Sequence, residues 1–85
     1  MKYILIAFNS RNLLYDFTKY LRYQGLQFSV INTPRAISIS CGLSVKVGYV
    51  FYNHIMNVVT KNKDSIKGVY IAEKVGSAEK FQKIF

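Results

Sequence analysis

The chain of 85 residues lacks several features that common functional classes need. It has one cysteine, one proline, one histidine and no tryptophan, and only four of its residues are acidic. A single cysteine cannot form an internal disulfide, and a zinc site needs three or four ligands. We therefore expect neither a disulfide scaffold nor a metal centre, and no cofactor.

Long apolar runs are also missing. The longest are ILIAF near the start and VGYVFY further on, and both are far shorter than the roughly 20 residues that cross a bilayer. The polar stretch NSRN follows the first run at once, which does not match a signal peptide. We expect a small cytoplasmic protein without membrane attachment, forming one domain over residues 1–85, with its core in 3–74 and a tail in 75–85.

The charge of the chain is strongly one-sided. Twelve lysines and arginines against four acidic residues give a net charge of +8. Such a field attracts acidic proteins, nucleic acid or anionic small molecules. The basic residues are spread along the chain rather than joined in runs, so a dedicated nucleic-acid arm is not indicated.

The apolar pattern predicts strands alternating with helices. In chain order we expect a strand at Tyr3–Phe8, a helix from a cap at Asn9 or Ser10 to Gly25, a strand at Leu26–Asn32, a strand from Gly42 or Leu43, a helix at Tyr49–Lys61, a strand at Gly68–Lys74 and a short closing helix from Ser77. This order predicts an α+β protein with a ferredoxin-like βαββαβ sandwich, in which an antiparallel sheet carries two helices on one face.

That fold hosts metal carriers, RNA-binding modules, ligand sensors and sulfur-relay proteins, so it does not select a function. The chain contains no HExxH, CxxC, paired acids or phosphate-binding loop, and we do not expect an enzyme. His54 is expected to face solvent or to be partly packed on the second helix. The tyrosine-containing strands lack an RNA-recognition signature, so RNA binding stays an alternative that rests on charge alone. Open sheet edges and an apolar C-terminus keep a homodimer among the expectations.

Cys41 supports two interpretations. In the first it lies in a turn after Pro34, where the charge of Arg35 favours the reactive thiolate, serine hydroxyls donate to that thiolate and a glycine lets a partner approach; the surrounding residues are Arg35, Ser38, Ser40 and Gly42. In the second it shares the apolar phase of a strand with Ile39 and Leu43, since free cysteine is often buried. The protein would then be an interaction or regulatory module, and the pattern alone leaves both open.

The segment TPRAISISCGLS, residues 33–44, resembles the TPRxISxSCG motif of the bacterial selenium/sulfur (Se/S) carrier protein-like family. The layout is similar from about Tyr3 to Lys74. The resemblance implies that Cys41 holds sulfur or selenium as a persulfide or selenosulfide and passes it to a partner. It implies Arg35, Ser38 and Ser40 as the surroundings of the thiol and Gly42 as a hinge. Transient donor and acceptor proteins are the implied partners.

Overall fold

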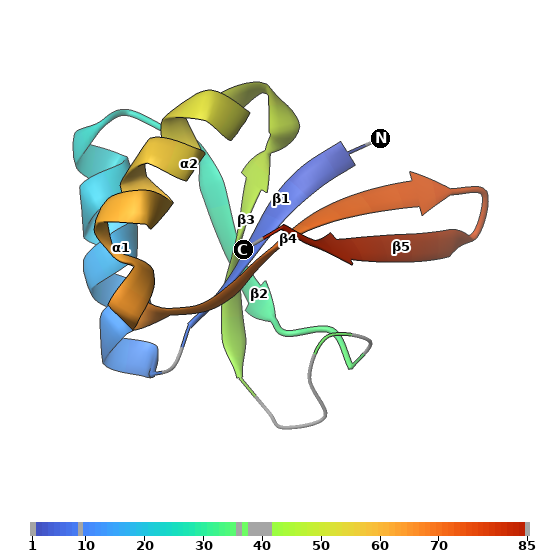
Figure 1. The fold of residues 1–85 in the computed structure, drawn as a ribbon, viewed down its shortest axis with the longest axis horizontal. Helices are drawn as coiled ribbons and strands as arrows, with labels where there is room; N and C mark the ends of the chain where they lie inside the picture. The colour runs from blue at the N-terminus through green and yellow to red at the C-terminus, as the bar shows by residue number, and fades with distance from the viewer. Residues whose placement is uncertain (1, 9, 36, 38–41, 85) are drawn as a thin grey trace.

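A computed structural model describes residues 2–8, 10–35, 37 and 42–84 (Figure 1). Five strands form one antiparallel sheet in the order β2-β3-β1-β4-β5. The strands are β1 (Lys2–Phe8), β2 (Phe28–Asn32), β3 (Leu43–Gly48), β4 (Ile66–Val75) and β5 (Ala78–Lys83), and the helices are α1 (Arg11–Tyr23) and α2 (Tyr52–Lys61). The predicted α+β class, with an antiparallel sheet and two helices, is confirmed.

Local hydrogen bonds set both ends of α1. The Ser10 hydroxyl accepts a hydrogen bond from a backbone N–H of the first turn at 3.2 Å, as an N-cap residue does. At the other end Gly25 has φ +74°, and its N–H donates to the Arg22 carbonyl while the Leu26 N–H donates to the Leu21 carbonyl. These two bonds form a Schellman motif. The predicted cap at Ser10 and the helix end at Gly25 are both confirmed.

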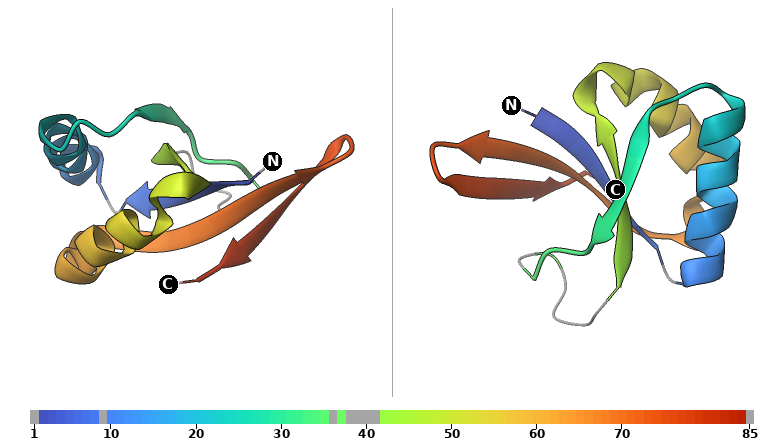
Figure 2. Two further views of the ribbon diagram at one scale, coloured as in Figure 1. Left: turned by 90° about the horizontal axis from the view of Figure 1, so that it is seen from above. Right: turned by 180° about the vertical axis from the view of Figure 1, so that it is seen from behind.

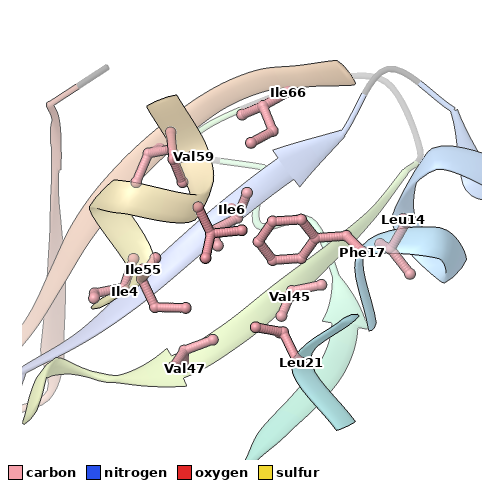
Figure 3. Packing of buried hydrophobic residues seen from close by; sticks show 12 residues of the cluster. Ile4, Ile6, Leu14, Phe17, Leu21, Val45, Val47, Ile55, Val59 and Ile66 are labelled. Atoms are coloured by element: carbon pink, nitrogen blue, oxygen red, sulfur yellow. The ribbon is translucent and has the colours of Figure 1, made fainter. Parts of the chain in front are cut away.

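Both helices cover the same face of the sheet, which we call the helix face (Figure 3). Side chains from α1 and α2 meet alternate residues of the three central strands in one apolar cluster. Its members are Ile4, Ile6, Leu14, Phe17, Leu21, Val45, Val47, Ile55, Val58, Val59, Ile66 and Val69. The stripe of apolar residues at three- and four-residue spacing in α1 is what turns that helix toward the sheet.

The opposite face, which we call the open face, carries no helix (Figure 2). Tyr3, Leu5 and Ala72 are buried there, and half-buried side chains surround them. These surrounding side chains are Ile31, Ile37, Tyr70 and Phe81. Because Ile37 belongs to the connection between β2 and β3, that connection helps to cover the open face.

The prediction of a C-terminal helix is wrong, because residues 78–83 form strand β5. Gly76 and Ser77 make a two-residue loop in which Gly76 has φ +62°, and Val75 pairs with Ala78 across it. A glycine with positive φ at the first loop position is typical of a tight hairpin turn, which returns the chain along β4. The sheet therefore has a fifth strand, and the β4–β5 hairpin extends beyond the rest of it (Figure 1).

Two further boundaries differ from the expectation. The region predicted as a helix from Tyr49 starts with a 3₁₀ turn at Tyr49–Phe51, and α2 begins at Tyr52. Strand β4 begins at Ile66, earlier than Gly68, and a register shift between Ala7 and Phe8 brings Phe8 opposite Ile66. Neither helix in the described part of the chain has the length and apolarity that a membrane crossing requires.

Candidate functional site

The connection between β2 and β3, residues 33–42, contains all of the predicted site residues. Cys41, Ser38 and Ser40 lie outside the described residues. Arg35 and Gly42 are described, and both are exposed. In Figure 1 the described residues that directly follow β2 lie on the side away from α1 and α2.

Hydrogen bonds close the base of the connection. The Thr33 N–H donates to the Gly42 carbonyl at 2.8 Å, which extends the β2–β3 ladder by one residue pair. The hydroxyl oxygens of Thr33 and Ser44 lie 2.6 Å apart, within a hydrogen bond, and Ser44 is fully buried. A Cβ added at Gly42 would meet only the Thr33 hydroxyl, at 3.6 Å. The residue that follows Cys41 is therefore fixed to the sheet.

Further along, the connection turns and contacts the open face. The Ile37 N–H donates to the Pro34 carbonyl at 3.0 Å, which closes a turn. The Ile37 side chain is half-buried against the cluster of Tyr3, Leu5 and Ala72. An apolar contact in the middle of a surface connection limits its freedom, since leaving the sheet would expose apolar area to water.

Tyr3 links the open face to the last strand. Its hydroxyl donates to the Glu79 carboxylate, with distances of 3.0 and 3.2 Å to the two oxygens. Burial raises the pKa of Tyr3, and the hydrogen bond to Glu79 and the negative charge of that carboxylate raise the pKa further. On the other side, the Lys46 ammonium lies 4.4 Å from the centre of the Tyr3 ring, within the range of a cation–π contact.

A shallow hollow of about 760 Å³ lies at the end of the β2–β3 hairpin that is remote from the connection. Three cationic side chains, Lys2, Arg22 and Lys46, contribute to its lining, together with residues 26–30, Tyr3 and Gly48. No acidic side chain is among the lining residues. The sequence did not predict this group, because its cations come from three different elements. Lys46 alone had a signal in the sequence, since it lies in the polar phase of the alternation in β3.

The remaining candidate is His54, which is exposed on α2, as predicted. The described residues contain no group of three histidine, cysteine or acidic side chains that could hold a metal ion.

The fold and site define a small α+β protein whose motif-bearing connection is anchored between two strands of an antiparallel sheet. A family model described as "Putative Se/S carrier protein-like" matches residues 2–71, and the chain belongs to this family. The match includes the whole β2–β3 connection. Searches among curated proteins and among solved structures gave no match.

Proposed function

We propose that the protein is a thiol carrier that holds sulfur or selenium on Cys41 and passes it to a partner protein. The observation that carries the proposal is the family match over residues 2–71, which spans the only cysteine of the chain. The anchored base of the connection supports it, because the neighbouring Gly42 is bonded to Thr33 on the adjacent strand.

The chemistry needs no cofactor. The Cys41 thiolate attacks the outer sulfur of a donor persulfide, so that a new S–S bond forms while the S–S bond of the donor breaks and the donor leaves as a thiolate. An acceptor thiolate then attacks the outer sulfur on Cys41, and Cys41 returns to the thiolate form. No net oxidation or reduction occurs, and selenium takes the place of the outer sulfur in the selenium version.

The surroundings of the thiol have separate roles in this proposal. Arg35 supplies positive charge that favours the thiolate over the neutral thiol. Ser38 and Ser40 donate hydrogen bonds to the same anion, and Gly42 leaves space for the partner that delivers or takes the sulfur. We place this chemistry in the cytoplasm, where thiols stay reduced, with transient donor and acceptor proteins as partners.

We also propose that β1, α1, β2, β3, α2 and β4 form a ferredoxin-like unit to which β5 is added. The support is the order β2-β3-β1-β4, in which all neighbours are antiparallel. In such a unit the β2–β3 connection lies at one end of a hairpin, where a partner can reach it without disturbing the helices.

The first test is loading with a small persulfide, such as glutathione persulfide, followed by intact-mass measurement. We expect the folded protein to gain one sulfur atom and Cys41→Ser to gain none while keeping its circular dichroism spectrum. A matched control moves the thiol to an exposed hairpin turn in Cys41→Ser/Ser77→Cys, which should load several-fold more slowly. Equal loading of the two thiols would mean that the surroundings of Cys41 contribute nothing.

The second test separates a carrier from an interaction module with Cys41 in its core. Native protein and unfolded protein are alkylated across a range of pH. A carrier predicts rapid native labelling with a midpoint below the free-thiol value of about 8.5. Labelling only after unfolding would refute the carrier function, because a buried thiol cannot meet a donor.

A further inference from the structure

The two edges of the sheet differ in charge. Strand β5 forms one edge and carries Glu79, Lys80 and Lys83. Strand β2 forms the other edge, and its sequence FSVIN contains no charged residue and no proline. Charged side chains on an edge strand discourage pairing with another chain. The β5 edge is therefore protected in this way, whereas the β2 edge is not.

The hydrogen-bond pattern shows which backbone groups of β2 are free to pair. Thr33 bonds its opposite residue Gly42, so the residues that exchange ladder bonds with β3 alternate from there, at Ile31 and Ser29. The N–H and C=O groups of Phe28 and Val30 consequently point away from β3. In the described chain β2 is the last strand on this side of the sheet, and the Val30 side chain is 40% exposed.

Positive charges flank this edge on both faces of the sheet. On the helix face the Arg22 guanidinium lies 5.6 Å from the centre of the Phe28 ring. On the open face Lys46 stands opposite Ser29 in the β2–β3 register. Both cations line the shallow hollow described above, which we call the basic hollow because Lys2, Arg22 and Lys46 contribute to its lining. Within the described residues the one salt bridge joins Lys2 to Glu73 at 3.7 Å, so neither Arg22 nor Lys46 has an acidic partner there.

We propose that the β2 edge and the basic hollow together bind an extended acidic segment of a partner protein by strand addition. The backbone of the segment pairs with Phe28 and Val30. Successive side chains of a strand point to opposite faces, so two adjacent acidic residues place one carboxylate on the side of Arg22 and the other on the side of Lys46. Backbone pairing gives affinity in this mode, and the side-chain contacts give specificity.

Two other occupants fit less well. A second copy of the chain brings the same charge of +8 to an edge that is already flanked by cations. Single-stranded nucleic acid binds by stacking bases on aromatic rings, but the rings of Tyr3 and Phe28 in the hollow each have a cation near one face.

The binding surface stands on its own geometry, and only its use in sulfur transfer rests on the proposed function. Strand β2 has five residues, a length of about 16 Å, and it leads directly to Thr33 at the base of the motif connection. A partner segment that pairs along β2 would therefore bring the rest of the partner close to residues 33–42.

The test uses a synthetic peptide of threonine and valine with two adjacent central glutamates, against the same peptide with glutamines. Binding is followed by amide NMR shifts of the isotope-labelled Cys41→Ala protein, so that the result does not depend on sulfur chemistry. We expect shifts centred on residues 28–32, weaker binding of the glutamine peptide, and weaker binding at high salt.

Three variants and one competitor decide the outcome. Arg22→Gln/Lys46→Gln should lose roughly fivefold to tenfold in affinity, whereas the control Lys63→Gln/Lys67→Gln, with the same change in net charge, should keep it. Val30→Pro removes an outward N–H without breaking a ladder bond and should abolish the β2 shifts.

Equal losses in the two double variants would overturn the inference in favour of non-specific attraction. Unchanged binding by a folded Val30→Pro protein would exclude strand addition. A single-stranded oligonucleotide that displaces the peptide, or a concentration-dependent dimer that blocks it, would identify a different occupant and reject the proposal. Failure of Cys41 to accept sulfur would leave peptide binding intact, so the two proposals fail separately.

Discussion

The two faces of the sheet are built by different kinds of interaction. On the helix face, twelve buried apolar residues of the described chain form one cluster, and two helices close it. On the open face the buried cluster within the described residues consists of Tyr3, Leu5 and Ala72, and polar links such as Thr33–Ser44 and Tyr3–Glu79 lie around them. Apolar burial is non-directional and scales with area, whereas a hydrogen bond fixes two groups relative to one another. The helix face therefore supplies stability, and the open face fixes the position of the motif-bearing connection.

The largest effect is expected from a truncation on the helix face. Leu21 belongs to α1 and is fully buried against the sheet, so Leu21→Ala should lower the free energy of unfolding by about 2–5 kcal/mol. Ile37→Ala on the open face should cost about 1–2 kcal/mol, since Ile37 is only half-buried. Denaturant unfolding of both variants measures the difference. Tyr23→Ala, at a position that is 87% exposed, is the control and should change stability by no more than about 0.5 kcal/mol.

If Ile37→Ala cost as much as Leu21→Ala, the open face would be a second main core, and the contrast between the two faces would be wrong. A cost near zero for Ile37→Ala would instead mean that the connection does not hold to the sheet through this side chain.

A smaller loss is expected at the base of the connection. Thr33→Val keeps the shape of the side chain but removes the hydroxyl that bonds Ser44, which leaves a buried hydroxyl without its partner. We expect a loss of about 1–3 kcal/mol in the free energy of unfolding. The matched control is Thr60→Val, because the Thr60 hydroxyl donates to the Met56 carbonyl at an exposed helix position. Denaturant unfolding measures both losses. Equal losses in the two variants would show that the buried Thr33–Ser44 hydrogen bond contributes no more to stability than the exposed one at Thr60.

The smallest effect is expected at Tyr3 and depends on pH. Tyr3→Phe removes the bond to Glu79 and should cost about 1 kcal/mol at neutral pH. Because the pKa of folded Tyr3 lies above the ordinary value of 10.0, this group contributes its stability below pH 10.0 and loses it as the pH rises through the folded pKa. The wild type should therefore lose its advantage over Tyr3→Phe in alkaline solution.

The measurement is the free energy of unfolding of both proteins as a function of pH. Tyr23→Phe, which removes a hydroxyl at a position that is 87% exposed, is the control substitution. A constant difference between wild type and Tyr3→Phe across the alkaline range would show that the Tyr3 hydroxyl titrates as it does in the unfolded chain.

Local signals in the sequence predicted most of the elements. The cap at Ser10, the glycine that ends α1 and the alternation in β3 each depend on a few neighbouring residues, and each element formed as expected. The prediction of a C-terminal helix was wrong although the sequence contains a local signal for a hairpin. Gly76-Ser77 between Val75 and Ala78 is a two-residue hairpin loop, and the turn decided the structure of the residues that follow it.

Long-range contacts around the candidate site could not be predicted from local sequence patterns. The Tyr3–Glu79 bond joins residues 76 positions apart, and it depends on β5, which the sequence did not predict. The basic hollow needs a lysine from β1, an arginine from α1 and a lysine from β3. Their proximity follows from strand register and helix placement, which spacing along the chain does not encode. By contrast, the segment 33–44 that carried the family resemblance is contiguous, and the family predicted from it is the one whose model matches residues 2–71.

The central position of β1 has a consequence for how the chain reaches its native state. Its neighbours in the sheet are β3 and β4, so Ile4 pairs with Val47 on one side and with Ile71 on the other. During synthesis on a ribosome this apolar segment emerges long before either neighbour and has no partner strand in the meantime. Closing such distant contacts costs chain entropy before the contacts stabilise anything, and exposed strands of this kind aggregate readily. We expect the nascent chain to depend on chaperones until β4 has emerged, and a fragment that ends before β4 to be insoluble.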